Sequence, residues 1–457
     1  MRSLKYLIFI SVLLLTGVLS VGAQDLSADE IIIKQLPDKP FLPDPLLVAD
    51  GVSGEEITTR AMWKQKREWI KSQYEYWVSG SLPPAPDRVY SRILFERTEN
   101  DVVIRMVEIS WGPDQEAKIT VELMIPPVKG KLPVFMTQWN QRGWAQVAVR
   151  RGYIGCVYAG ADAKDDTDNY DEIYENNDFA TLMKRAWGSH RVVDYLYTLP
   201  EVDQDKIALT GHSRNGKQSL MAAAFDDRIG AVVSSSGGTG GESLFRFTDR
   251  RFDTESVEEI TRNFPHWFHP RLRLFTGREQ KLPVDQNSLM ALIAPRGLML
   301  SSAITEGQGN PWAIEKAYKS VKTVYDFLDA EDQIAINLRG GRHATAARDI
   351  EDFVDFFDYI FGRTTTQPAN EIFYDYSFAK WKNLSGENAA DLPEFDLNND
   401  RKEEVAARIQ WLLGDEPPGI FNNSEMTWEN RRSEDDYLGD VIGQPHWEGM
   451  QKMLIRP

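Results

Sequence analysis

The sequence GHSRNGK, residues 211–217, places a serine where nucleophilic chemistry is possible. The apolar run that ends just before it predicts a strand, and the residues from Arg214 onward predict a helix. A serine on such a sharp turn has its hydroxyl raised above the end of a sheet, at a helix N-terminus. The pattern departs from G-x-S-x-G, because Asn215 stands where the second glycine is expected and Gly216 follows it. Ser213 is therefore a candidate nucleophile, and an ordinary structural turn is the alternative.

A nucleophilic serine needs a base, and the base needs an acid that orients it. In the α/β-hydrolase fold these follow in the order serine, acid, histidine, each at the end of a strand. His343 meets the requirement for the base, since it lies in a Gly-rich loop just after the predicted strand QIAINL. The other histidines fit less well, because one lies inside a helix, one points away from the turn, two lie in PHWFHP and one lies near the C-terminus: His190, His212, His266, His269 and His446.

The best candidate for the acid is Glu306, which follows the predicted strand GLMLSSA. The end of the preceding strand, VVSSSGGTGGES, is the second possible place, but it offers only serines before Glu242. Glu306 is preferred, and a solvent-exposed loop glutamate is the alternative interpretation.

Ester hydrolysis by a serine also requires donors aimed at the developing negative charge on the carbonyl oxygen. The backbone amide of Arg214 is one natural donor, and its guanidinium could add a charge-assisted hydrogen bond. The second donor is expected from WNQRGW, residues 139–144, with Gln141 as the candidate. A structural ion pair is the alternative role for the Arg214 side chain.

The elements that must position these residues predict an α/β-hydrolase fold. RVYSRILFE, DVVIRMVEIS and KITVELMIP alternate with period two and predict three antiparallel strands. After Pro127, continuous apolar strands alternate with amphipathic helices, which predicts a mainly parallel sheet sandwiched by helices. Residues 56–78 predict a helix before the strands, and residues 24–57 are Pro-rich and irregular.

The chain ends offer further expectations. Residues 1–23 have a basic start, an apolar stretch and small residues before Gln24, which predicts an export signal rather than a membrane anchor. The expected division is then a wrapping segment with its helix at 24–87, the hydrolase domain at 88–365 and an acidic extension at 366–457. That extension holds 18 acidic against 9 basic residues and one candidate helix, EEVAARIQWLLG. It is either the start of a second domain or an extension that packs on the surface.

Composition excludes several classes of function. The net charge of −17 argues against nucleic-acid binding. Cys156, in an apolar run, is the single cysteine, so no intramolecular disulfide is possible and a buried, inert thiol is expected. The acidic loop GADAKDDTDNYDE lacks the glycine and the closing glutamate of a calcium loop, and no cofactor motif is present, so neither a metal nor a cofactor is expected.

Three segments together carry a resemblance to a known family. GHSRNGK, NFPHWF at residues 263–268 and LPVDQNSLMALIAPRGLML at residues 282–300 resemble the glucuronoyl esterases, carbohydrate esterase family 15, and related exported bacterial xylan esterases. The resemblance covers about residues 40–362 and places the second glycine of the turn at Gly216. It implies hydrolysis of the ester between glucuronate on xylan and lignin alcohols, by a serine mechanism without a cofactor.

By this resemblance Ser213 is the nucleophile, His343 the base and Arg214 the oxyanion stabiliser. The resemblance implies that the sugar is contacted by Lys217, Trp312 and Trp267. The alternative is that the lysine is solvated and that the tryptophans belong to the core. Two departures are visible. Fungal members place their acid shortly after the turn, where this chain has Ser235 and Ser236, and the glutamate before the Trp-Phe pair is absent from NFPHWF.

The sequence therefore predicts an exported serine esterase acting on a polysaccharide or lignin-carbohydrate ester, with no nucleic-acid partner and no membrane anchor. An acetyl xylan esterase is the alternative enzyme, and a degenerate hydrolase that only binds carbohydrate is the alternative of another class. The oligomeric state is left open.

Overall fold

The computed structural model describes residues 28–39, 42–48, 54–248, 254–370 and 372–373. The export signal predicted at residues 1–23 and the helix predicted in EEVAARIQWLLG lie outside the described residues, as does almost all of the acidic extension. Within the described residues, no helix combines the length and apolar character needed to span a membrane.

One mixed sheet of nine strands dominates the described part of the chain, in the order β1-β2-β3-β5-β4-β8-β9-β10-β11. The first three strands and β5 pair antiparallel, and from β5 onward all neighbours pair parallel. The strands are β1 (Tyr90–Glu99), β2 (Val102–Trp111), β3 (Ala117–Ile125), β4 (Leu132–Gln138), β5 (Ile154–Tyr158), β8 (Val202–His212), β9 (Ala231–Ser235), β10 (Gly297–Ala303) and β11 (Ile334–Arg339). A small hairpin joins β6 (Gly160–Ala161) and β7 (Lys164–Asp165).

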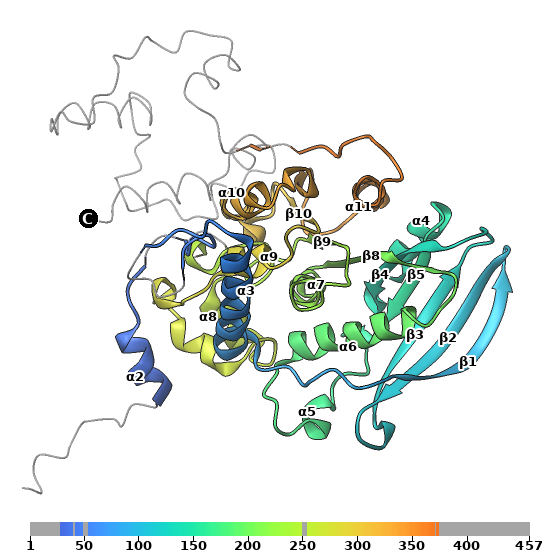
Figure 1. The fold of residues 1–457 in the computed structure, drawn as a ribbon, viewed down its shortest axis with the longest axis horizontal. Coiled ribbons are helices and arrows are strands. Elements are labelled where there is room, and N and C mark those ends of the chain that lie inside the picture. The colour runs from blue at the N-terminus through green and yellow to red at the C-terminus, as the bar shows by residue number, and fades with distance from the viewer. Residues whose placement is uncertain (1–27, 40–41, 49–53, 249–253, 371, 374–457) are drawn as a thin grey trace, which may run out of the picture.

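Helices cover both faces of this sheet. Successive side chains of a strand point to opposite faces, so strands that are apolar throughout need cover on both sides. The helices are α2 (Ala28–Gln35), α3 (Arg60–Tyr74), α4 (Arg142–Arg150), α5 (Tyr170–Ile173), α6 (Thr181–Leu196), α7 (Arg214–Phe225), α8 (Val257–Asn263), α9 (Gln286–Ala291), α10 (Pro311–Phe327) and α11 (Ala347–Ile360). Helices α4 and α11 pack on one face, against Phe135, Ala208 and Val233. The opposite face packs against α6, α7, α9 and α10, and Figure 1 shows α6 and α7 on the side away from α4 and α11.

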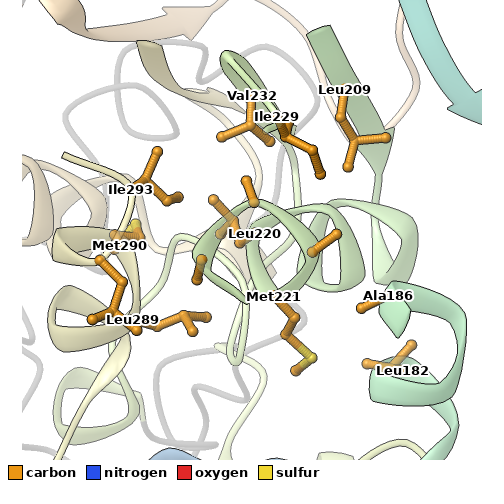
Figure 2. Packing of buried hydrophobic residues seen from close by; sticks show 14 of the residues in the cluster. Leu182, Ala186, Leu209, Leu220, Met221, Ile229, Val232, Leu289, Met290 and Ile293 are labelled. Carbon is orange, nitrogen blue, oxygen red and sulfur yellow. The ribbon is translucent and has the colours of Figure 1, made fainter. Parts of the chain in front are cut away.

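Helix α7, which begins directly after Ser213, is almost completely buried. In Figure 2 its Leu220 and Met221 lie between α6, represented by Leu182 and Ala186, and α9, represented by Leu289. Burying one leucine or methionine side chain contributes about 1.5–3 kcal/mol. The helix that carries the candidate nucleophile is thus fixed from several sides, which makes its N-terminus a rigid platform.

The observed architecture confirms the predicted α/β-hydrolase fold, a mainly parallel sheet with an antiparallel N-terminal group of strands. The helix predicted at 56–78 is α3, which begins where the Thr59 hydroxyl accepts a hydrogen bond from the Met62 amide. The predicted irregularity of residues 24–57 is wrong in part, because α2 forms there and buries Ile33. Cys156 is buried and free, and burial raises the pKa of its thiol, as expected for an inert side chain.

Candidate active site

Ser213 occupies the tight turn between β8 and α7. Its backbone has φ 59° and ψ −131°, a region that non-glycine residues rarely adopt. Its amide donates a hydrogen bond of 2.8 Å to the carbonyl oxygen of Ser235, which ends the neighbouring strand β9. A strained serine held at the carboxyl end of a parallel sheet is the geometry that a nucleophile elbow requires.

Two glycines make this turn possible. A Cβ at Gly211 would lie 2.2 Å from the backbone oxygen of Asn215, and one at Gly216 would lie 2.9 Å from the Ser234 hydroxyl. A side chain at Gly211 would displace the first turn of the helix, and one at Gly216 would press against Ser234 of the neighbouring strand. The second close approach therefore falls at Gly216, and the Asn215 side chain is free to bond elsewhere, which is the physical reason for the shifted pattern.

His343 and Glu306 meet above the ends of β11 and β10. The imidazole Nδ1 and the carboxylate Oε1 are 2.5 Å apart, and the imidazole is 48% exposed while the carboxylate is 5% exposed. Burial acts to raise the pKa of Glu306, but hydrogen bonds from His343 and Ser236 and the nearby imidazole charges outweigh it, so that its pKa lies below the usual value. Glu306 is thus a buried carboxylate directed at a histidine, not a solvent-exposed loop residue.

His212 lies closer to this pair than the sequence predicts. Its ring centroid is 4.5 Å from that of His343, and its Nδ1 is 3.4 Å from the Ser235 hydroxyl. The prediction that His212 points away from the turn is therefore wrong, because β8 continues to His212 and directs its ring toward the His343 loop. Burial, followed by the charge of His343, lowers the pKa of His212 to about 4, so it stays neutral near pH 7. No hydrogen bond joins the Ser213 hydroxyl to His343 among the described residues.

The Arg214 side chain is oriented by two contacts. Its Nε is 3.0 Å from the Asp162 carboxylate, and its guanidinium carbon is 5.4 Å from the ring centre of Trp267. Asp162 also pairs with the buried Arg185 at 2.9 Å. The acidic loop therefore anchors arginines, and the ion pair considered as the alternative for Arg214 does exist. Asp162 is a residue that the sequence reasoning missed, since its partner is 52 positions away in the chain.

Gln141 lies beside the start of α7. It ends a short 3-10 turn, Trp139–Gln141, and its Oε1 accepts a hydrogen bond of 2.7 Å from Nδ2 of Asn215. The loop after β4 is thus fastened to the elbow helix next to Ser213, on the side where a second oxyanion donor is expected.

The three residues implied to contact a sugar are all buried. Lys217 is 2% exposed, with its ammonium 2.6 Å from the Thr239 carbonyl oxygen and 2.7 Å from Glu255. Trp267 is 5% exposed, stacks on Phe264 with a centroid distance of 3.8 Å, and has the charges of Arg214 and Lys217 over its ring. Lys217 is therefore not a solvated lysine, which was the alternative considered from the sequence.

Trp312 lies apart from these contacts. It is 6% exposed and packs on Phe247 with a centroid distance of 5.2 Å, so its packing is that of a core residue.

Glu242, the residue at the second possible place for the acid, bonds to no histidine of the described residues. Its carboxylate accepts hydrogen bonds from the Ser234 hydroxyl at 2.6 Å and the Gly237 amide at 2.7 Å. Complete burial raises its pKa to about 7. Glu242 therefore fixes the turn after β9.

Comparison with known proteins supports the same fold and points to one class of enzyme. A family model described as fungal glucuronyl esterase matches residues 113–329. Carbohydrate esterase MZ0003, from an unknown prokaryotic organism, is 28% identical over 398 residues, covering 71% of this chain and 90% of the relative. The 4-O-methyl-glucuronoyl methylesterase 1 of Wolfiporia cocos is 27% identical over 315 residues, covering 64% of this chain and 73% of the relative.

A solved structure agrees with these matches. A promiscuous esterase of carbohydrate esterase family 15 from a marine bacterial metagenome superposes with a TM-score of 0.62 and 26% identity, covering 72% of this chain and 98% of the other. Fold and matches together define an esterase of the α/β-hydrolase class. In sequence and fold the chain is similar to the glucuronoyl esterases, carbohydrate esterase family 15.

Proposed function

We propose that this protein is a serine carboxylesterase that cleaves glucuronate esters of xylan. The observation that carries the proposal is the pairing of His343 with the buried Glu306 at the strand ends beside the Ser213 elbow. The matches supply the class of ester, since the relative from Wolfiporia cocos is named a 4-O-methyl-glucuronoyl methylesterase.

In the proposed reaction, the Ser213 oxygen attacks the ester carbonyl carbon while His343 accepts the serine proton through Nε2. The electron pair of the carbonyl bond moves to its oxygen, where Arg214 and the loop at Gln141 stabilise the negative charge. Collapse of this intermediate breaks the bond to the alcohol oxygen, which takes the proton from His343 and leaves. Water then attacks the acyl-enzyme in the same way and releases the uronic acid and free Ser213.

Glu306 has a defined part in this sequence. Its carboxylate bonds to Nδ1 of His343, which leaves Nε2 free to face the serine and stabilises the imidazolium formed during attack. The low pKa of Glu306 supports this role, because the group must stay ionised throughout the reaction.

The surroundings favour a sugar acid as the acyl group. Arg214 and Lys217, in the first turn of the helix that follows Ser213, both stand over the face of the Trp267 ring. Cationic donors complement the oxygen-rich uronic acid more closely than they complement a methyl group of acetate. The half-exposed His343 supports an open site that admits the end of a polymer.

The test compares a benzyl glucuronate ester with acetylated xylan, using the wild type and Ser213→Ala. Turnover of the glucuronate ester alone, abolished in Ser213→Ala, supports the proposal. Turnover of acetylated xylan alone would establish an acetyl xylan esterase instead. If neither ester is hydrolysed while xylan fragments still bind, the chain is a carbohydrate-binding relative.

We also propose export from the cell, on the pattern of residues 1–23. Expression of the full chain with detection in the periplasm or medium tests this. Retention of the unprocessed chain in the cytoplasm would contradict it.

A further inference from the structure

Arg339, the last residue of β11, forms a clamp around the loop that carries His343. Its side chain is 5% exposed. One terminal nitrogen, Nη1, donates to the carbonyl oxygens of Arg342 at 3.1 Å and Ala344 at 2.9 Å. The other, Nη2, donates to the carbonyl oxygen of His343 at 3.3 Å and to the Ser236 hydroxyl at 3.1 Å.

The loop at residues 340–346 depends on this clamp for its shape. It belongs to no helix or strand, it begins with two glycines, and its residues are almost all exposed. Three of its carbonyl oxygens converge on one guanidinium, whose planar, five-donor geometry holds several acceptors at fixed angles. Burying an arginine is costly unless its donors are satisfied, and here the two terminal nitrogens make these hydrogen bonds while Nε lies 3.8 Å from the Asp349 carboxylate.

The Ser236 hydroxyl extends the clamp toward the acid. A serine hydroxyl has a single proton, and its oxygen here accepts from Arg339, so the proton remains available for another acceptor. Glu306 needs such a donor, because His343 takes Oε1 while Oε2 is buried with no hydrogen-bond partner in the described part of the chain. The Ser236 amide donates a hydrogen bond of 2.7 Å to the carbonyl oxygen of Ser301 in β10, the strand that leads to Glu306, and a hydrogen bond from the Ser236 side chain is among the causes that lower the pKa of Glu306.

We propose that Arg339 and Ser236 are positioning residues for the esterase reaction, forming a chain Arg339–Ser236–Glu306–His343 that fixes both partners of the base. Arg339 holds the histidine loop by its carbonyl oxygens. The guanidinium also polarises the Ser236 hydroxyl toward Oε2 of Glu306. Neither residue touches substrate. This inference rests on the proposed function, because it assumes that His343 is the base.

The test uses Arg339→Lys and Ser236→Ala, each measured for kcat and KM on the benzyl glucuronate ester. Lysine keeps the charge but cannot bridge several acceptors in one plane. We expect kcat to fall about 100-fold in Arg339→Lys and about 10-fold in Ser236→Ala, with KM within about threefold, because small misplacements of a catalytic group are costly. Urea unfolding of each variant shows whether its fold is retained.

Ser302→Ala is the matched control. Ser302 is the next-to-last residue of β10, and its buried hydroxyl, which has no hydrogen-bond partner among the described residues, lies with the Glu306 carboxyl group around Gly309. If Ser302→Ala lowers kcat and Ser236→Ala does not, Ser302 supplies the proton to Glu306 and the proposed chain is overturned. Wild-type kcat in both Arg339→Lys and Ser236→Ala overturns it as well.

A second readout separates this inference from the proposed function. The rate at which a fluorophosphonate labels Ser213 reports serine activation without requiring the correct ester. Slower labelling in Arg339→Lys and Ser236→Ala supports the proposed contacts Arg339–Ser236–Glu306–His343 even if the wild type hydrolyses neither test ester. Unchanged labelling rates in both variants contradict it even if glucuronate ester hydrolysis is confirmed.

Discussion

Nδ1 of His343 lies 2.5 Å from Oε1 of Glu306, although the two residues are 37 positions apart in the chain. Strands β10 and β11 pair parallel and in register, from Leu298 opposite Ile334 to Ala303 opposite Arg339. The two loops that leave their carboxyl ends must therefore start side by side. This pairing brings a buried carboxylate to an exposed imidazole.

The pairing predicts a severe effect of Glu306→Gln. The amide is neutral and can hold the imidazole in the wrong tautomer, so we expect kcat to fall by as much as ~10⁴-fold, as for comparable losses of a triad acid. The measurement is kcat on the benzyl glucuronate ester. Glu242→Gln is the matched control, because Glu242 is also buried but contacts no histidine. Equal rates for Glu306→Gln and the wild type would remove Glu306 from the site.

The ion pair between Asp162 and Arg214 predicts a milder effect. Asp162→Asn removes the charge that orients the guanidinium beside Ser213, so we expect kcat/KM to fall roughly 10-fold, the worth of one charge-assisted hydrogen bond. Asp171→Asn is the control in the same acidic segment, residues 160–172, since Asp171 pairs with Lys184. If both variants lose the same activity, the effect comes from the loop as a whole and not from Arg214.

The raised pKa of Glu242 predicts a pH-dependent stability. Between its usual value of 4.5 and about 7, the unfolded chain has released this proton while the folded chain retains it. The free energy of unfolding therefore falls as pH rises through this window, by ~3 kcal/mol at most from this group. In Glu242→Gln this contribution disappears, so the variant gains stability relative to the wild type between pH 5 and pH 8. Urea unfolding at pH 5 and pH 8 measures the difference in free energy of unfolding between the variant and the wild type. The same difference at both pH values would refute the raised pKa of Glu242.

The close approach at Gly211 predicts the effect of a single methyl group. In Gly211→Ala the new Cβ would meet the Asn215 carbonyl oxygen at 2.2 Å, so α7 must move or the protein must unfold. We expect a loss of several kcal/mol, in the range of severe core changes. Gly143→Ala serves for comparison, because its Cβ would meet nothing within 4 Å and alanine favours a helix by about 1 kcal/mol. Thermal melting distinguishes them, and similar melting temperatures would contradict the argument.

The buried Lys217 predicts a specific effect on substrate binding. If its ammonium contacts the sugar acid, Lys217→Met should raise KM for the glucuronate ester about 10-fold or more while leaving hydrolysis of a small acetate ester nearly unchanged. Loss of both activities in parallel would instead assign Lys217 to the support of Thr239 and Glu255.

The sequence determined the order of elements, because a period of two, continuous apolar strands and amphipathic helices are local patterns. It also placed Ser213, His343 and Glu306 at strand ends, since a parallel sheet gathers those ends at one edge. The sequence did not predict helix α2, because short helices form through packing against the rest of the chain and not through propensity alone.

The tertiary structure alone decided which side chains support the site. That Asp162 holds Arg214, that His212 stands against His343 and that Arg339 clamps the His343 loop all depend on contacts between segments distant in the chain. Such contacts leave no periodic trace in a sequence, because side-chain direction and burial follow from the packing of the whole sheet and its helices. The tertiary structure likewise showed that Lys217 is buried, which its position in the sequence did not reveal.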